Sequence, residues 1–356
     1  NTNHLLAVKT ITHSYPFNPR SKTPLIFRST PQWFIKLDDD QHSVRKRALE
    51  AAENKIQFVP EWGKQRLLAM INNSPDWCLS RQRIWGVPIP IYSCSHCDET
   101  LASVQVMKKI ADEMETSGEG IEAYHSRPPE FFLGTQTCPR CHHNKWNKST
   151  DILDVWFDSG VCHAAVQRRR NLLQFPADIY LEGSDQHRGW FQTSLISAMA
   201  SVGHPPFKGL ITHGFVTDAS GYKMSKSQGN VVDPNEIIKK SGAEILRLWV
   251  AYEDYGQDVN VGEAIFQRVT ETYRRFRNTL RFMLGNLDDF HWKTHRVERS
   301  QMMELDQWAL SRLSNLTQRV TEAYNNYEFY KVFHALNVFF TTDLSATYLD
   351  VLKDRL

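Results

Sequence analysis

Near position 235 the pattern of apolar residues changes from strand-like runs that alternate with helices to helical spacing alone. Before that point, apolar runs at 178–183 and 209–217 have the length of buried strands, and a helical segment over 189–202 separates them. Strands that alternate with helices predict an α/β fold with a parallel sheet. After that point strand signals stop, and 243–252 and the rest of the chain have the spacing of helices. We therefore expect an α/β region followed by an all-α region.

The α/β region has less regular parts. Residues 1–35 are predicted to form short strands between proline-containing turns, and 43–57 and 61–72 have helical composition. Residues 87–92 alternate apolar residues with proline and are expected to be extended. The segment 93–148 looks like an insertion, with a charged helix near its beginning and few residues suited to a core.

Composition limits the classes of protein that fit. The chain has 356 residues, of which 41% are hydrophobic, enough for two or more domains with cores. Its 42 Lys and Arg nearly balance its 40 Asp and Glu, which argues against a purely electrostatic nucleic-acid binder but permits local basic patches. No apolar run is long enough to span a bilayer, and no signal peptide opens the chain. We expect a soluble, cytoplasmic protein.

Four of the six cysteines form two C-x-x-C pairs. In a cytoplasmic protein paired cysteines favour zinc over disulfides, and four thiolates make the closed tetrahedral set of a structural zinc site. The long segment between the pairs weakens this interpretation, and four free thiols are the alternative. Three nearby histidines, His96, His142 and His143, are reserve ligands. The candidate metal ligands are Cys94, Cys97, Cys138 and Cys141.

Residues 223–227 form a Lys-Met-Ser-Lys-Ser string between Gly221 and Gly229. Two lysines three residues apart on a small, glycine-flanked loop are able to converge on a polyphosphate and to stabilise the charge of a leaving pyrophosphate. On composition alone, a solvated surface loop is the commoner role for such residues.

A second polar segment, 181–191, overlaps the end of the apolar run at 178–183. Ligands of open α/β sheets bind beyond the carboxyl ends of the strands, and Glu182 and Asp185 lie on that turn. Acidic groups there bind a substrate ammonium or ribose hydroxyls. Ser184 or Asp185 could equally be an ordinary helix N-cap, so the residues alone leave the two interpretations even.

The strings at 223–227 and 181–191 (Leu-Glu-Gly-Ser-Asp-Gln-His-Arg-Gly-Trp-Phe) resemble two motifs of the class I aminoacyl-tRNA synthetases, in the form of the isoleucine branch. The stretch 76–90, with DWCLSRQR and WGVPIP, and the segments 151–160 and 273–278 are similar to further parts of that branch. The resemblance covers nearly the whole chain. It implies the second half of the family's Rossmann-like nucleotide-binding fold, with a zinc-knuckle insertion, followed by an all-α helical domain.

The resemblance also implies roles for single residues. Lys223 and Lys226 would be catalytic and bind the ATP phosphates, with Lys226 the stronger candidate for stabilising the transition state. Trp190 and Trp156 would wall the amino-acid pocket, although core packing is the commoner role of a tryptophan. The implied ATP contacts are Lys223, Met224, Ser225, Lys226 and Ser227, and the implied aminoacyl-adenylate contacts are Glu182, Gly183, Asp185, Gln186, Trp190 and Trp156.

The helix expected after residue 262 carries a cluster of arginines. Arginines on one helix face bind RNA phosphates in a salt-dependent way, although a solvated face is the usual role of a charge run. The resemblance makes this region the start of the tRNA-binding part. The candidate contacts are Arg274, Arg277 and Arg281.

The His-Ile-Gly-His motif of the family is absent from this sequence, and so is nearly all of the editing domain. A start at Asn1 and an unfinished apolar helix before Leu356 fit a piece of a longer protein. Residues 18–20 read Asn-Pro-Arg where the family usually has Cys-Trp-Arg. The implied parts are a return segment from the editing domain (1–35), the second half of the catalytic domain (36–235, with the insertion 93–148), a stem-contact helical region (236–300) and the start of an anticodon-binding domain (301–356).

The implied function is ATP-dependent activation of isoleucine and its transfer to tRNA(Ile), with ATP, Mg²⁺ and structural Zn²⁺ as cofactors. The intact enzyme would be monomeric and free of membranes, and this piece alone would be inactive. The alternatives are a valine- or leucine-activating enzyme of the same subclass, or a non-catalytic, zinc-containing tRNA-binding module. Amino-acid dependence separates the first alternative, and the upstream coding sequence separates the second.

Overall fold

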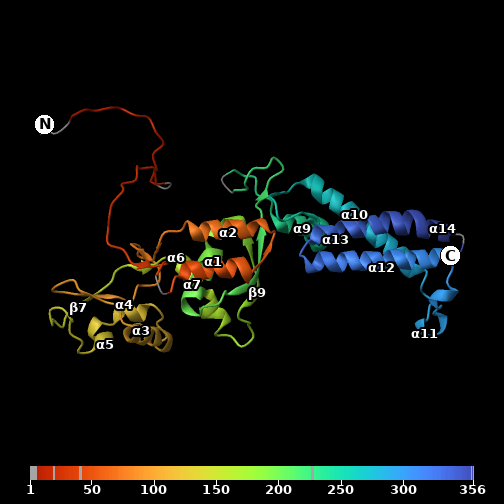
Figure 1. The fold of residues 1–356 in the computed structure, drawn as a ribbon. Helices are drawn as coiled ribbons and strands as arrows, with labels where there is room; N and C mark the ends of the chain where they lie inside the picture. Colours follow the sequence, from red (N-terminus) through yellow and green to blue (C-terminus); the bar gives the residue numbers. More distant parts are fainter. Residues whose placement is uncertain (1–5, 19–20, 40–41, 226–227, 354, 356) are drawn as a thin grey trace. The chain divides into compact units, whose positions relative to one another are not determined.

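A computed structural model describes residues 6–18, 21–39, 42–225, 228–353 and 355 (Figure 1). Its contacts form two compact units. The first consists of Asn1–Ile35 with Trp77–Leu153, and the second of Lys36–Asp76 with Asp154–Leu356. The cysteine pairs fall in the first unit, and the candidate substrate-binding residues fall in the second. None of the described helices combines the length and the apolar content that crossing a bilayer requires.

The second unit contains a parallel sheet of three strands. In spatial order these are β2 (Gln57–Val59), β10 (Phe207–His213) and β9 (Ala177–Gly183). The register places His213, the last residue of β10, beside Gly183, the last residue of β9. The parallel sheet predicted from the sequence is therefore confirmed. The expectation that β9 is a buried strand is only partly met, because Leu181 is 56% exposed.

Three helices pack together beside this sheet (Figure 1). They are α1 (Val44–Asn54), α2 (Trp62–Asn72) and α7 (Trp190–Ser201). Helix α7 connects β9 to β10, as a parallel pair requires. Its residues from Phe191 to Met199 are all buried, which is typical of an apolar helix covered on every side. The helices predicted over 61–72 and 189–202 are confirmed.

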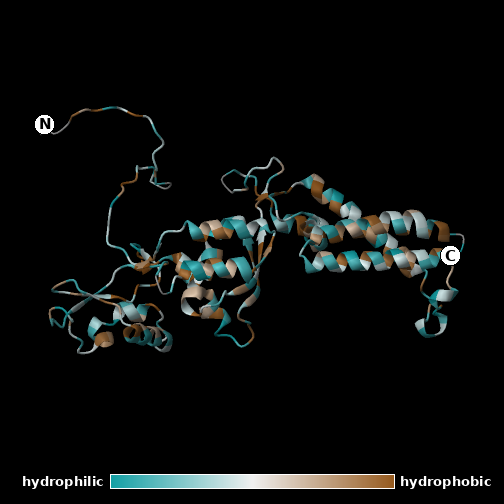
Figure 2. Ribbon diagram, in the orientation of Figure 1, coloured by the Kyte–Doolittle hydropathy of each residue, from teal (hydrophilic) through white to brown (hydrophobic). Residues whose placement is uncertain are grey.

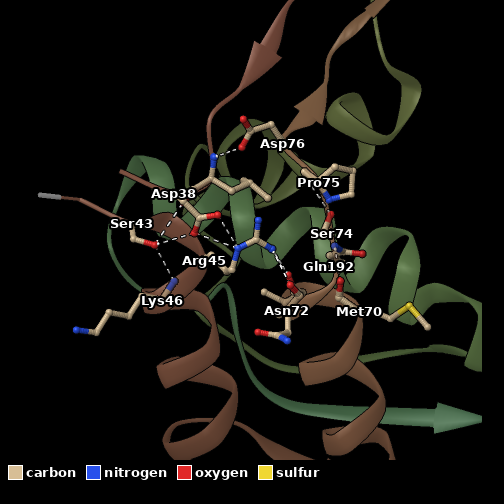
Figure 3. A network of polar contacts seen from close by, with 12 residues as sticks. Asp38, Ser43, Arg45, Lys46, Met70, Asn72, Ser74, Pro75, Asp76 and Gln192 are labelled. Atoms are coloured by element: carbon tan, nitrogen blue, oxygen red, sulfur yellow. Dashed lines mark hydrogen bonds and ion pairs between the residues drawn. The ribbon is translucent and has the colours of Figure 1, made fainter. Parts of the chain in front are cut away.

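A polar network joins the ends of these helices (Figure 3). Arg45 Nε on α1 lies 3.0 Å from both carboxylate oxygens of Asp38, and Arg45 Nη1 donates to the carbonyl of Asn72 at 3.3 Å. Gln192 on α7 donates to the carbonyl of Met70 on α2 at 3.4 Å. Charge-assisted bonds of the Arg45 kind are among the stronger ones in proteins. The network therefore holds α1, α2 and α7 in fixed positions beside the strands.

Two predicted elements end earlier than expected. The helix predicted over 43–57 ends at Asn54, because the next residues form β2 and pair with β10. The strand predicted over 209–217 breaks at Gly214 into β10 and the short β11 (Val216–Thr217). A Cβ on Gly214 would lie 2.1 Å from the carbonyl oxygen of Gln257, so a second backbone segment crosses there. Close approach of two backbones thus ends β10.

In the described residues after 233, helices predominate, as expected, and the one strand there is the short β12 (Val259–Asn260), which pairs with β11. Figure 2 shows apolar and polar residues mixed along the long helices, as amphipathic packing requires. Side chains of α9, β12 and α10 share one apolar cluster. The helices are α8 (Pro234–Ser241), α9 (Ala243–Tyr252), α10 (Glu263–Gly285), α11 (Trp292–His295), α12 (Glu304–Asn325), α13 (Phe329–Val338) and α14 (Leu349–Leu352), with a π-helical stretch over Phe339–Tyr348.

The insertion over 93–148 has a core of its own, so the expectation of few core residues is wrong. Its buried side chains include Tyr124, Phe132 and Trp146, which come from short elements whose aromatic residues carry no periodic signal. The elements are the sheet β6 (Thr100–Leu101), β5 (Tyr92–Cys94) and β7 (Trp146–Lys148), with helices α3 (Val104–Thr116), α4 (Glu122–Ser126) and α5 (Pro129–Leu133). Helix α3 confirms the charged helix predicted near the start of the insertion.

The rest of the first unit is less regular. Two antiparallel pairs join β1 (Phe34–Ile35) to β3 (Trp77–Cys78), and β4 (Ser80–Arg81) to β8 (Ile152–Leu153). The prediction of several short strands in 1–35 is wrong, because the described part before β1 has one β-bridge, between Phe17 and Pro24. Its apolar side chains, such as Ile26 at 90%, are exposed and have no sheet to cover them in the described part.

Candidate functional site

The carboxyl edge of the parallel sheet brings three polar side chains together. A Cβ on Gly183 would lie 2.9 Å from Oδ1 of Asp185 and 3.5 Å from Cε1 of His213, so both side chains converge on this glycine. Glu182, next to it, is exposed, and its carboxylate accepts a hydrogen bond from the Gly183 N–H at 3.2 Å. The edge therefore offers two carboxylates and an imidazole, at the place where open α/β sheets bind ligands.

The turn after β9 is a 3-10 helix over Ser184–Arg188. Gln186 Oε1 accepts a hydrogen bond from the backbone N–H of Trp190 at 3.0 Å, and Gln186 Nε2 donates to Asp185 Oδ2 at 3.3 Å. The side chain that bonds the first turn of α7 is therefore Gln186, and neither Ser184 nor Asp185 is the N-cap of α7. The Asp185 carboxylate stays exposed.

His187 anchors this turn. Its buried ring lies near Trp62 and Phe191, with ring centroids 5.7 and 5.4 Å away, and its Nδ1 lies 3.0 Å from the carbonyl oxygen of Ser184. Burial lowers the pKa of His187, so the ring is neutral and Nδ1 carries the proton that it donates to Ser184. A Cβ on Gly63 would come within 3.2 Å of Nε2, so α2 approaches the ring through a glycine.

Two tryptophans flank the turn in different ways. Trp190 stacks on Tyr180, with 4.1 Å between ring centroids, and its Nε1 donates to the Ser159 carbonyl at 3.2 Å. Trp156, on helix α6 (Val155–Gly160), is 41% exposed, and its ring lies against Gly189, where an added Cβ would meet it at 2.9 Å. Packing therefore holds Trp190, while Trp156 keeps exposed ring surface beside the turn.

The lysine-containing loop follows the short strand β11. Lys223 forms an isolated bridge with Thr217, and its Nζ lies 5.6 Å from the ring centroid of Phe215. Met224 packs against the apolar cluster of α9, β12 and α10, so this side chain anchors the loop to the helical region. Ser225 donates its backbone N–H to Oδ1 of Asn230 at 2.9 Å. The two remaining predicted residues of this loop, Lys226 and Ser227, lie outside the described residues.

The two cysteine pairs meet in the first unit. Sγ of Cys94 lies 3.5 Å from Sγ of Cys141, and Sγ of Cys97 lies 3.6 Å from Sγ of Cys138. All four sulfurs lie within 4.8 Å of one another. Sulfurs bound tetrahedrally to zinc at about 2.3 Å would be about 3.8 Å apart, so the four cysteines fit this metal. Burial acts to raise the pKa of Cys94, but backbone hydrogen bonds from His96 and Cys97 lower it to about 7. The pKa values of Cys97 and Cys141 are raised, so without a metal the set favours a single thiolate at Cys94.

The arginines singled out on α10 share an exposed surface. Arg274, Arg277 and Arg281 are all exposed, and none of them forms an ion pair with another described residue. On the same helix Phe266 and Val269 are buried in the apolar cluster. The guanidinium groups are therefore free of protein carboxylates within the described part of the chain.

Sequence reasoning missed two residues that the structure places at the site. His213 is the last residue of β10, and Glu182 is the last but one of β9. Because neighbouring parallel strands end at the same sheet edge, that rule could have identified His213 from the sequence. Asn230 directly follows the lysine loop, but its partner Asp218 lies 12 residues earlier. Because no local pattern joins those two positions, the sequence gives no signal for their contact.

The parallel sheet with an acidic turn at its carboxyl edge, the lysine loop and the helical region together point to one class of protein. The chain belongs to the class I tRNA synthetases, since the profile described as "tRNA synthetases class I (I, L, M and V)" matches residues 8–262. A second profile, "Anticodon-binding domain of tRNA ligase", matches residues 306–356. The fold class expected from the sequence is thereby confirmed.

Within that class the chain is similar to isoleucine–tRNA ligases. It is 50% identical to the ligase of Syntrophotalea carbinolica over 353 residues, which cover 99% of this chain and 38% of that protein. It is 49% identical to the ligase of Geobacter sulfurreducens over 351 residues, which cover 99% of this chain and 38% of that protein. The chain thus spans less than two fifths of the length of these relatives.

Solved structures of two other synthetases share the fold. Mycobacterium tuberculosis methionyl-tRNA synthetase bound by methionyl-adenylate matches 97% of this chain and 57% of its own, with a TM-score of 0.61 at 16% identity. An Agrobacterium radiobacter LeuRS in a ternary complex with tRNA and LeuAMS matches 79% of this chain and 37% of its own, with a TM-score of 0.55 at 21% identity. At these identities the likeness concerns the fold alone.

Proposed function

We propose that this chain supplies part of the catalytic domain and the start of the tRNA-binding region of an isoleucine–tRNA ligase. The main support is the identity of 50% to such a ligase over 99% of the chain, a span that includes the acidic turn and the lysine loop. In the first step the isoleucine carboxylate attacks the α-phosphorus of ATP, and pyrophosphate leaves with the electrons of the broken P–O bond. In the second, a hydroxyl of the terminal adenosine of tRNA(Ile) attacks the adenylate carbonyl, and AMP leaves.

The acidic turn would hold the aminoacyl-adenylate. Glu182 and Asp185 are exposed carboxylates on one sheet edge, suited to the substrate ammonium and the ribose hydroxyls. Gly183 is buried and has no side chain, which leaves room for the Asp185 carboxylate beside it, and Gln186 orients that carboxylate by its hydrogen bond. Fixed positions of two reactants supply a large share of the rate in such transfers.

The side chain of the bound isoleucine would lie against the two tryptophans beside the turn. Trp156 would offer its exposed ring surface, and Trp190, held by its stack on Tyr180, would form the rigid wall. Apolar walls of this kind separate isoleucine from larger or polar amino acids. They do little against valine, which lacks one methylene, and the handling of valine is a general problem for these enzymes.

The lysine loop would bind the ATP phosphates. Lys223 and Lys226 supply the positive charge, and Lys226 is the residue that we assign to stabilising the pyrophosphate as it leaves. Met224, Ser225 and Ser227 complete the ATP-binding loop, with Met224 as its apolar anchor. Mg²⁺ would accompany the ATP and neutralise part of the phosphate charge.

The four cysteines would hold a structural Zn²⁺. A set of four thiolates leaves no open position for a substrate, so the metal would stabilise the insertion and take no part in the reaction. Two of the ligands, Cys94 and Cys138, belong to the buried core of the insertion, which ties the metal to its folding.

We further propose that Arg274, Arg277 and Arg281 contact tRNA(Ile) phosphates. Their exposure and their lack of ion pairs with described residues suit that role. The division that we propose is a return segment from an editing domain (1–35), the second half of a catalytic domain (36–235), a stem-contact region (236–300) and the start of an anticodon-binding domain (301–356). The whole enzyme would be a cytoplasmic monomer.

A chimera tests this function. The chain replaces the matching segment of the Geobacter sulfurreducens ligase, and charging of a tRNA(Ile) transcript with isoleucine is measured. We expect charging, and we expect Asp185→Ala to lower kcat/KM by about 100-fold because a ligand contact is lost. The matched control is Asp178→Ala at the other end of β9, where the exposed carboxylate pairs with Lys208, and it should change kcat/KM by less than about twofold. Equal losses in both variants, or no charging by a folded chimera, would count against the proposal.

A further inference from the structure

The lysine loop has a neck formed by two side chains that lie 12 residues apart. Asn230 Nδ2 donates to Oδ2 of Asp218 at 2.8 Å, which joins the two ends of the loop. Both residues are half-buried. This pair, Asp218 with Asn230, is called the neck below.

Asp218 organises the first side of the loop. Its Oδ1 accepts hydrogen bonds from the backbone N–H groups of Ser220 and Tyr222, each at 2.9 Å. Its own N–H donates to the Tyr222 carbonyl at 2.9 Å. The hydrogen bond from Asn230, followed by that from the Tyr222 N–H, holds the pKa of Asp218 below its ordinary value, so the group is a carboxylate at neutral pH.

Asn230 organises the stretch that carries the first lysine. Its Oδ1 accepts a hydrogen bond from the backbone N–H of Ser225 at 2.9 Å. Besides its bond to Asp218, its Nδ2 donates to the backbone carbonyl of Lys223 at 3.3 Å. The amide group thus holds the backbone on both sides of Met224, whose side chain packs into the helical cluster.

The neck is flanked by two glycines in the left-handed region. Gly221 has φ of 82° and Gly229 has φ of 68°, and an added Cβ at either would meet nothing within 4 Å. These glycines are therefore required by backbone conformation and not by crowding. They allow the backbone to bend sharply close to the neck, while the hydrogen bond between Asp218 and Asn230 keeps the two ends of the loop together.

We propose that Asp218 and Asn230 are positioning residues that fix the base of the lysine loop, so that Lys223 and the residues after it meet the phosphates of ATP from a preset direction. This inference rests on the proposed function. Neither side chain needs to touch ATP, because both act through the backbone of the loop. A preset loop avoids the ordering cost that a free loop would incur as charge develops on the leaving pyrophosphate.

Because Asp and Asn have the same shape, the carboxylate and the amide group of the neck can be exchanged between the two positions. In Asp218→Asn, the Oδ1 position still accepts the two backbone bonds, but an NH₂ group replaces Oδ2 and faces the NH₂ of Asn230. In Asn230→Asp, two carboxylates face each other. The double variant Asp218→Asn/Asn230→Asp restores a donor opposite an acceptor. Only the 3.3 Å contact to the Lys223 carbonyl then lacks its donor.

The test is isoleucine-dependent ATP–pyrophosphate exchange by the chimera. Each single variant should lower kcat by about tenfold or more, since a hydrogen bond to a charged group is lost. The KM for isoleucine should stay within about twofold, because the proposed function assigns the loop to the ATP phosphates and not to the amino acid. The double variant should recover most of the lost kcat. Asp233→Asn is the matched control, since Asp233 only caps helix α8 and an asparagine caps equally well.

Hydrogen–deuterium exchange of the 356-residue chain gives a second readout that needs no activity. The peptide that covers 219–225 should exchange faster in each single variant and return towards the wild-type rate in the double variant. Faster exchange with unchanged kcat would show a structural role alone and would overturn the proposal, as would a double variant no better than the singles. An inactive wild-type chimera would count against the proposed function, and the exchange rates would then decide whether the neck exists.

Discussion

At Gly189 the backbone passes so close to two candidate site residues that it leaves no room for a side chain. An added Cβ would lie 2.9 Å from the ring of Trp156 and 2.7 Å from Oε1 of Gln186. We expect Gly189→Ala to displace the tryptophan or break the bond from Gln186 to α7, at a cost of about 1–3 kcal/mol in unfolding free energy. Urea denaturation measures this cost.

Gly285 provides the control for that substitution. It lies at the end of helix α10, has ordinary backbone angles, and an added Cβ would meet nothing within 4 Å. Gly285→Ala should leave the stability unchanged or raise it by about 0.5 kcal/mol, because alanine restricts the unfolded chain. Equal destabilisation by the two substitutions would contradict the packing described at Gly189.

Two buried histidines give the second unit a dependence on pH. Burial lowers the pKa of His187 and of His163, and His163 is also near the charge of Arg168. The unfolded chain therefore binds protons more tightly than the folded one. The contribution of these two histidines to stability should be constant above about pH 6.5, the ordinary value for histidine, and should fall as the pH drops below it towards the lower folded values.

His163→Gln tests this dependence. Glutamine is able to keep a hydrogen bond to Ser197, which lies 3.1 Å from Nε2 of His163, but it does not titrate. Urea midpoints at pH 7.5 and at a pH about one unit below the ordinary histidine value should differ less in the variant than in the parent chain. An unchanged pH dependence would mean that His163 takes its proton as easily in the folded state as in the unfolded one.

At the scale of elements, the proposed zinc site makes the insertion depend on its four cysteines, which is open to test. Its core is small, and Trp146 and two of the cysteines belong to it. Removal of bound Zn²⁺ with a chelator, or Cys141→Ser, should therefore unfold this segment and expose Trp146, because binding energy of a structural metal is folding energy. The emission of Trp146, read in a chain whose other tryptophans are replaced, reports the change. Cys162→Ser is the control, since Cys162 lies outside the cluster.

The long helix α10 should behave as an RNA-binding element. Replacing Arg274, Arg277 and Arg281 by Gln should weaken binding of a tRNA(Ile) transcript. It should also reduce the slope of log K against log salt concentration by up to about three in magnitude, because up to three phosphate contacts are lost. Replacing Lys293, Arg296 and Arg299, three exposed residues beyond the helix, by Gln is the matched change of charge. An equal effect of both sets would indicate attraction by net charge alone and not a contact by this face.

An element could be predicted when the residues that stabilise it are close together in the sequence, and it was missed when they are far apart. Helix α7 was predicted because twelve residues carry their own apolar signal. Strand β2 was missed because three residues after a helix are too few to show alternation, and its pairing with β10 is long-range. The break at Gly214 comes from residues near Gln257, about forty positions later in the chain.

At the scale of the whole molecule, the parts of the site that depend on local sequence could be predicted, and the parts that depend on long-range contacts could not. Each C-x-x-C pair, the acidic turn and the lysine loop is a local string of a few residues. Spacing indicated the metal site, and the resemblance to a known family indicated the roles of the other two. His213 and the neck of Asp218 with Asn230 depend on strand register and on loop closure. The division into two compact units, with 77–153 returning to the N-terminal segment, likewise depends on contacts between distant parts of the chain.

The most direct test of the account is the amino-acid dependence of ATP–pyrophosphate exchange by the chimera that carries this chain. The account predicts exchange with isoleucine, much weaker exchange with leucine and methionine, and loss of exchange in Lys226→Ala. A folded chimera that gives exchange with a different amino acid better than with isoleucine would contradict the assignment of this chain to an isoleucine–tRNA ligase, and one that keeps its rate without Lys226 would contradict the role proposed for that lysine.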